Sequence, residues 1–107
     1  DLYAGKMHAL LFRNWKSRVK GRDWFDFEWY VRNDVPLDFR HLQTRTFEFN
    51  GIEMDRSDFK ERLKDRLASV NIEMVRRDVM PFLKNSEATA IWSNDYFLQL
   101  ADRIRFL

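Results

Sequence analysis

Residues 21–32 have the sequence Gly-Arg-Asp-Trp-Phe-Asp-Phe-Glu-Trp-Tyr-Val-Arg, and this stretch decides the fold class. It predicts a helix from Asp23 through about Arg32, with Asp23 as the N-cap or as an acidic residue of the first turn. Large apolar side chains cover most of the circumference of this helix instead of a single stripe. We therefore expect other elements to surround it at the centre of the core. These side chains are Trp24, Phe25, Phe27, Trp29, Tyr30 and Val31.

An amphipathic helix is predicted before this stretch, at about residues 2–15, where apolar residues recur at spacings of three and four. A basic connection follows, and residues 13–22 contain no acidic residue. We expect the two helices to fold back on each other at about residue 19. The pairs that would then lie level are Arg13 with Asp26 and Lys16 with Asp23. The cations of the connection are Arg13, Lys16, Arg18, Lys20 and Arg22.

The rest of the chain is also predicted to be mostly helical. Pro36 follows a helix-stop signal and can open a short helix near residues 37–47. The alternation of polar and apolar residues at 44–49 leaves a short strand open as the alternative. Asn50-Gly51 is typical of a turn, and it separates this segment from the next helix.

Three polar residues are predicted to cap the later helices, namely Asp55 (with Asp58 three residues on), Asn71 and Ser93. Pro81 should end or kink the second of these helices, and residues 84–87 should form a polar loop. The expected buried faces are Phe59, Leu63, Leu67 and Val70 in the first, Ile72, Val75 and Val79 in the second, and Phe97, Leu100, Ala101, Ile104 and Leu107 in the last.

The chain is therefore predicted to be all-α, a compact bundle of five or six helices that forms one domain over residues 1–107. A hydrophobic fraction of 45% is enough to offset the entropy of folding. The lack of Cys and the scarcity of His exclude disulfides and the usual zinc sites. No apolar run approaches the roughly 20 residues that cross a bilayer, so we expect a soluble cytoplasmic protein. Because the chain begins at Asp1 without an initiator Met, we expect a piece of a longer protein.

Two groups of charged residues are the places where chemistry could occur, since glycine-rich phosphate loops and paired-His metal motifs are absent. On the first helix, Lys6 and Arg13 lie about 10 Å apart on one stripe. On the second, Asp23 and Asp26 share a face near the positive end of the helix dipole, with Arg22 beside them. Structural ion pairs are the favoured explanation, and a solvated basic surface and a ligand site are the alternatives.

Lys6 stands out among these charges, because the antiparallel arrangement offers it no acidic partner except Asp34. A cation without a partner is a better candidate for binding a phosphate. His8 and His41 have no metal-like spacing and are expected at the surface or in hydrogen bonds. The four Trp are expected in the core rather than as platforms for nucleic-acid bases, because they lie at helical spacing beside other apolar residues. They are Trp15, Trp24, Trp29 and Trp92.

Two short motifs, Lys-x-x-Ala-Leu-x-x-Arg at residues 6–13 and Gly-Arg-Asp-x-x-Asp-aromatic at residues 21–27, resemble the C-terminal part of the AbiEii/AbiGii family of nucleotidyltransferase-like toxins. Residues 70–83 and 92–107 are also similar to the C-terminal helices of that family. The resemblance therefore covers nearly the whole chain. In this family a polymerase-β-like domain supplies a glycine-serine loop and metal-binding acids, and the helical half supplies a lysine and an aspartate to the same cleft.

The resemblance implies a catalytic role for Lys6, which matches the family's lysine, and for Asp23 or Asp26, between which the motif leaves the choice open. It also implies substrate binding by Arg13 and Arg22. Lys6 would bring a point charge to the triphosphate, and the aspartate would supply hydrogen bonding or orientation. Mg²⁺ and a nucleoside triphosphate are expected in the intact protein. No metal ligand and no cofactor are expected in this chain alone, which should be inactive without the nucleotidyltransferase half.

The function implied by the resemblance is that of the C-terminal helical domain of a larger α/β nucleotidyltransferase-like protein, a toxin of a toxin–antitoxin and phage-defence system. The intact protein would transfer a nucleotide to an acceptor, for which RNA is a candidate, and would have a cognate antitoxin as its partner. The alternative is a non-enzymatic module that binds nucleic acid through the basic connection, or a protein through an apolar groove. We expect no membrane association, and we expect self-association if the missing half leaves an apolar face exposed.

Overall fold

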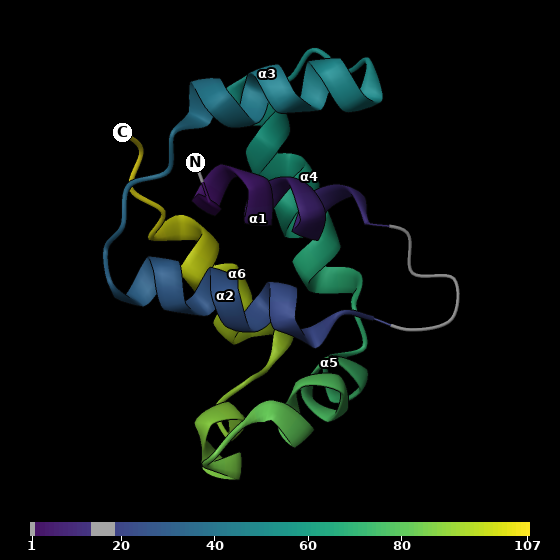
Figure 1. Ribbon diagram of the computed structural model, residues 1–107, viewed down its shortest axis with the longest axis vertical. Coiled ribbons are helices and arrows are strands. Elements are labelled where there is room, and N and C mark those ends of the chain that lie inside the picture. Colours follow the sequence, from purple (N-terminus) through teal and green to yellow (C-terminus); the bar gives the residue numbers. More distant parts are fainter. Residues whose placement is uncertain (1, 14–18) are drawn as a thin grey trace.

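The computed structural model describes residues 2–13 and 19–107 (Figure 1). These residues form six α-helices and two short 3₁₀ helices, and contain no β-strand apart from one isolated bridge, which confirms the all-α prediction. Within the described residues, no helix has the length and apolar composition that a bilayer crossing requires. The helices are α1 (Leu2–Phe12), α2 (Gly21–Arg32), α3 (Phe39–Asn50), α4 (Arg56–Ser69), α5 (Ile72–Val79), η1 (Met80–Phe82), η2 (Ser86–Thr89) and α6 (Asn94–Asp102).

Helix α1 lies between α3 and α2, with α4 and α6 on the side away from the viewer in Figure 1. Helix α5 packs against α2 at the lower end of the molecule, followed by η1 and η2. The side chains of Ala4, Met7 and Leu10 in α1 have no exposed surface. The most central helix is therefore α1 rather than α2.

Helix α2 only partly fulfils the prediction of a helix covered on all sides. Trp24, Phe27 and Val31 are buried as expected, but about half of the Trp29 side chain is exposed. The prediction was wrong for Trp29 because its side of α2 faces solvent, where the indole lies edge-on against the ring of Tyr30. Trp92 is buried as predicted, whereas Trp15 lies outside the described residues.

The predicted caps of the later helices are confirmed. Asp55 and Asp58 form a reciprocal capping box at the start of α4, and Asn71 and Ser93 accept hydrogen bonds from the first turns of α5 and α6. Residues 44–49 belong to α3, so the strand alternative is wrong.

The bounds of α3 also differ from the prediction. Asp38 caps its first turn, so Pro36 precedes the helix instead of opening it. The helix continues to Asn50 and ends at Gly51, which adopts a φ of 66°. This left-handed conformation favours glycine because it has no Cβ. The polar loop expected at residues 84–87 contains the start of η2.

The last residues of the chain were expected to continue the buried face of α6, but the helix ends at Asp102. Leu107 is exposed and Ile104 is only half-buried, because the segment after α6 is extended and its side chains no longer follow a helical period. Its backbone pairs with the α2–α3 connection. Leu37 N–H donates to Arg105 O at 2.7 Å, and Leu107 N–H donates to Leu37 O at 2.9 Å.

Candidate functional site

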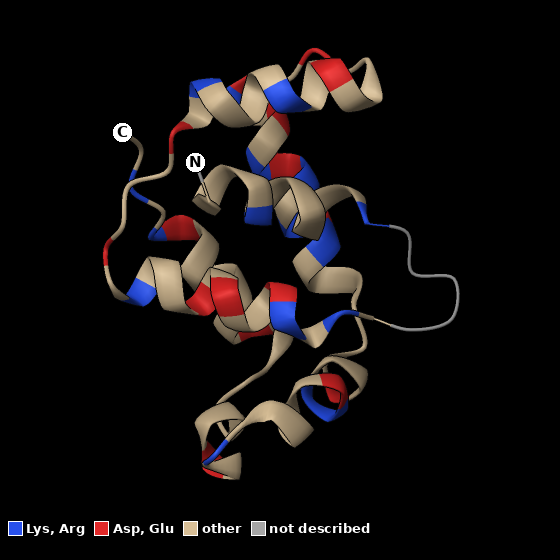
Figure 2. Cartoon of the chain, viewed as in Figure 1, with Lys and Arg blue, Asp and Glu red and all other residues tan. Residues whose placement is uncertain are grey.

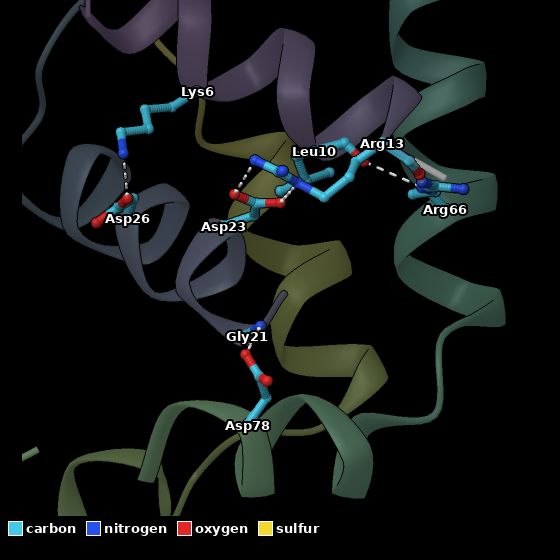
Figure 3. A network of polar contacts seen from close by, with 8 residues as sticks. All are labelled: Lys6, Leu10, Arg13, Gly21, Asp23, Asp26, Arg66 and Asp78. Carbon is cyan, nitrogen blue, oxygen red and sulfur yellow. Dashed lines mark hydrogen bonds and ion pairs between the residues drawn. The ribbon is translucent and has the colours of Figure 1, made fainter. Parts of the chain in front are cut away.

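Two ion pairs join α1 and the residue that follows it, Arg13, to α2 (Figure 3). Lys6 Nζ lies 3.0 Å from Asp26 Oδ2, and Arg13 Nε lies 2.9 Å from Asp23 Oδ2. Figure 2 shows the origin of this pattern, since residues 2–13 contain Lys6 and Arg13 but no acidic residue, and acidic residues follow one another along α2. The structure thus brings four of the predicted site residues together in two pairs.

The partners differ from the predicted ones. Arg13 pairs with Asp23 and not with Asp26, which is taken by Lys6. Helix α1 ends at Phe12 and α2 begins at Gly21, and the observed pairs show that the two helices are shifted along each other relative to the register predicted from a fold-back at about residue 19. Lys6 therefore has an acidic partner after all, and Asp34 pairs with Arg105 at 2.9 Å instead. The predicted pair of Lys16 with Asp23 involves a residue outside the described ones.

Burial distinguishes the two carboxylates. The side chain of Asp23 is 6% exposed, whereas that of Asp26 is 23% exposed. Arg13 also places Nη2 3.5 Å from Asp23 Oδ1, so the guanidinium spans both oxygens of the buried carboxylate. Such contacts satisfy a charge that has been removed from water. The Lys6 ammonium and Asp26 remain accessible to a ligand.

Asp23 belongs to a larger network that reaches α4. Arg66 Nε donates to the carbonyl oxygen of Leu10 at 3.0 Å, and its Nη2 donates to that of Arg13. These carbonyls lie at the C-terminal end of α1, where a cation is favourable. Burial lowers the pKa of Arg66, and the charge of Asp23 opposes that shift. The buried pair is therefore part of the packing of α1, α2 and α4.

The start of α2 is fixed by α5. Lys20 offers no side-chain cap, and the Gly21 N–H instead donates to Asp78 Oδ2 at 2.7 Å. A Cβ on Gly21 would lie 2.3 Å from the carbonyl oxygen of Val75, so only glycine permits this approach of the two helices. The contact sets the position from which Asp23 and Asp26 extend toward α1 (Figure 3).

The other predicted substrate-binding residue is not part of these pairs. Arg22 is exposed and, within the described part of the chain, makes no hydrogen bond or ion pair with another side chain. Of the remaining cations in the basic connection, Lys20 is exposed, and Lys16 and Arg18 lie outside the described residues.

The described residues do not fit a Mg²⁺ site. Nowhere among them do three or more His, Cys, Asp or Glu side chains form a group that could hold a metal ion. Asp23 and Asp26 each face a cation from α1, which is the opposite of the arrangement that a metal requires. No reaction step through a metal can therefore be assigned to these residues.

Helix α2 also carries a buried carboxylate, Glu28, that the sequence motifs did not single out. Its Oε2 accepts hydrogen bonds from Trp92 Nε1 at 3.1 Å and from the Tyr96 hydroxyl at 2.6 Å. Burial, together with the hydrogen bond to Glu28 and the charge of Glu28, raises the pKa of Tyr96 to about 12. The sequence contained a signal, because Glu28 is four residues after Trp24 and so lies on the buried stripe of α2.

Similarity to known proteins identifies the family of this chain but no individual relative. No curated protein and no solved structure matches the chain. Among protein families, residues 1–103 match the nucleotidyl transferase AbiEii toxin of type IV toxin–antitoxin systems. Since this match covers almost all of the sequence, including both ion pairs, the chain belongs to the AbiEii nucleotidyl transferase toxin family.

Proposed function

We propose that this chain is the helical domain of a nucleotidyltransferase toxin, and that Lys6 binds the triphosphate of a nucleoside triphosphate in the intact protein. The observation that carries the proposal is the Lys6–Asp26 pair, which lies at 3.0 Å and leaves 43% of the lysine side chain exposed. Family membership supplies the reaction, transfer of a nucleotide from the triphosphate. The pair supplies a cation in reach of a ligand.

The ammonium group of Lys6 has three N–H donors. Asp26 contacts Nζ from one side. The remaining donors can contact phosphate oxygens, where a compact positive charge stabilises the negative charge of the transferring group. Asp26 acts as a positioning residue that holds Nζ at the exposed surface between α1 and α2. Asp23 has a structural role, because its carboxylate is buried and bound by Arg13.

The chain alone should be inactive, because phosphoryl chemistry needs metal ions held by carboxylates. In the proposal, a nucleotidyltransferase domain of the intact protein supplies these carboxylates and a glycine-serine loop. Arg22 can steer the triphosphate, whereas Arg13 contributes less because Asp23 neutralises it. RNA is the proposed acceptor, a cognate antitoxin is the proposed partner, and the cytoplasm is the proposed compartment.

The test measures transfer of a labelled nucleotide by the intact toxin in the presence of Mg²⁺. We expect Lys6→Ala to reduce transfer about a hundredfold while the protein stays folded, since removal of one preorganised donor has an effect of that order. Lys64→Ala is a matched control, because Lys64 is also 43% exposed and is also paired, with Asp102. It should leave transfer unchanged.

Equal activities of wild type, Lys6→Ala and Lys64→Ala would contradict the proposal and would favour the alternative, a non-enzymatic interaction module. The gene provides a second check. An open reading frame that encodes a glycine-serine loop and an Asp-x-Asp pair before Asp1 supports the enzyme. A coding sequence without them supports the interaction module.

A further inference from the structure

A cluster of aromatic and basic side chains lies at the C-terminal ends of α1 and α3. The ring centroid of His8 is 5.2 Å from that of Phe12 and 5.8 Å from that of Phe49. His8 Nε2 donates to Asn50 Oδ1 at 2.7 Å, which holds the imidazole in place. Phe49 is 67% exposed, so a flat ligand can reach its ring.

A hollow of about 230 Å³ lies beside these rings. Its lining combines aromatic, amide and basic side chains and contains no carboxylate. The lining residues are His8, Ala9, Phe12, Arg13 and Asn50.

Two further guanidinium groups contact the rings of the cluster. The Arg45 guanidinium is 5.0 Å from the centre of the Phe49 ring, and that of Arg62 is 5.9 Å from the centre of the Phe12 ring. Neither arginine forms an ion pair with an acidic side chain among residues 2–13 and 19–107. Their charges are therefore available to an anion, while the aromatic contacts limit their orientations.

We propose that this cluster, His8, Phe12, Arg45, Phe49 and Arg62, binds unpaired nucleotides of a nucleic-acid strand. A base would stack on Phe49 beside His8, and the flanking phosphates would contact Arg45 and Arg62. An exposed aromatic ring beside unneutralised arginines suits a single strand, because every base has a face to stack and every linkage has a negative charge. In the proposed function, on which this role rests, the strand is the acceptor of the nucleotide.

The opposite face of α3 provides the contrast. Phe47 is 55% exposed and lines a separate groove of about 660 Å³. The charged residues of that groove are all acidic, and they repel a phosphate backbone. They are Glu48, Glu53, Asp55 and Asp58. Phe47 and Phe49 are thus similar exposed side chains in surroundings of opposite charge.

The experiment measures binding of a fluorescein-labelled single-stranded RNA to the intact toxin by fluorescence anisotropy, without nucleoside triphosphate or Mg²⁺. We expect Phe49→Ala to weaken binding about tenfold, since stacking on one aromatic ring has an effect of that size. Phe49→Trp should retain the affinity, and the matched control Phe47→Ala should not change it. Arg45→Gln together with Arg62→Gln should lower both the affinity and its salt dependence.

Several results would overturn the proposal. Equal binding by wild type and Phe49→Ala would do so, as would equal losses in Phe47→Ala and Phe49→Ala, which would indicate a general change in the helix. If free ATP displaces the strand from wild type but not from Phe49→Ala, the cluster is a mononucleotide site instead. A purified antitoxin that binds through Phe49, while RNA does not, would identify a protein interface.

The proposed transfer function can fail separately from this site. Lys6→Ala should retain RNA binding even though it loses transfer, because Lys6 faces α2 and the cluster lies toward α3. Conversely, transfer that depends on Lys6 together with RNA binding that does not depend on Phe49 would contradict only the inference about the strand.

Discussion

The two ion pairs between α1 and α2 use the same chemistry at nearly the same distance, 2.9 Å for Arg13–Asp23 and 3.0 Å for Lys6–Asp26. Their surroundings differ. The Asp23 carboxylate is nearly inaccessible and bound at both oxygens, whereas both members of the Lys6–Asp26 pair reach solvent. The motif that contains both aspartates therefore holds one carboxylate that is buried in the packing of the helices and one that reaches solvent.

Replacing each aspartate in turn should give the largest difference in stability. Asp23→Ala leaves Arg13 without the carboxylate that binds it in a partly buried site, and should lower the free energy of unfolding by about 3 kcal/mol. Asp26→Ala leaves Lys6 hydrated and should cost less than about 1 kcal/mol. Urea denaturation of the two variants measures the difference. Equal losses would mean that burial does not separate the roles of the two pairs.

Substitutions of two glycines test whether the close packing of α2 on α5 stabilises the fold. Gly21→Ala forces a Cβ to within 2.3 Å of the Val75 carbonyl oxygen. The resulting shift of α2 should cost about 2 kcal/mol and should weaken the buried Asp23 pair more than the exposed one. Gly5→Ala is the control, because no atom lies within 4 Å of its Cβ position.

In that control, alanine replaces glycine inside a helix, so stability should rise by up to about 1 kcal/mol. Thermal unfolding of both variants provides the measurement. A Gly21→Ala protein as stable as wild type would show that α2 and α5 can separate without affecting the rest of the fold.

The smallest expected effect concerns Glu28, the third acidic residue of α2, and its hydrogen-bond donor Tyr96. In the folded protein the pKa of Tyr96 is raised from 10.0 to about 12 by burial and by Glu28. The unfolded chain therefore releases the Tyr96 proton at a lower pH than the folded protein does. The stability that Tyr96 contributes is complete below pH 10 and is lost as the pH rises toward 12. The midpoint of urea denaturation should therefore fall less between pH 9 and pH 11 in Tyr96→Phe than in wild type. An identical fall would contradict the assignment.

The features that the sequence predicted correctly depend on neighbouring residues. The caps at Asp55, Asn71 and Ser93 bond within their own first turns, and so their patterns are visible in a few residues. The apolar stripes of α4 and α5 follow the helical period in the same way. The presence of charged partners between α1 and α2 was also predictable, because both helices and their charges were recognised.

The features that were missed depend on distant parts of the chain. The cap at the start of α2 comes from Asp78, and the donors to Glu28 come from the segment around Trp92 and Tyr96. The identity of the ion-pair partners depended on where the helices fold back, which no local pattern determines. Trp29 could not be placed outside, because sequence shows that a side chain is apolar but not which face of its helix another helix covers.

The bridge between Leu37 and Phe106 also bears on the kinetics of folding. The segment after α6 can pair with the α2–α3 connection only when α2, α3 and α6 already have their relative positions. This backbone pairing, which we call the clasp, closes a long loop and should form late in folding. Hydrogen exchange at the Leu37 and Leu107 amides reports its opening. Exchange faster than in α1 would identify the clasp as a separate cooperative unit that releases the end of the chain while the helices remain folded.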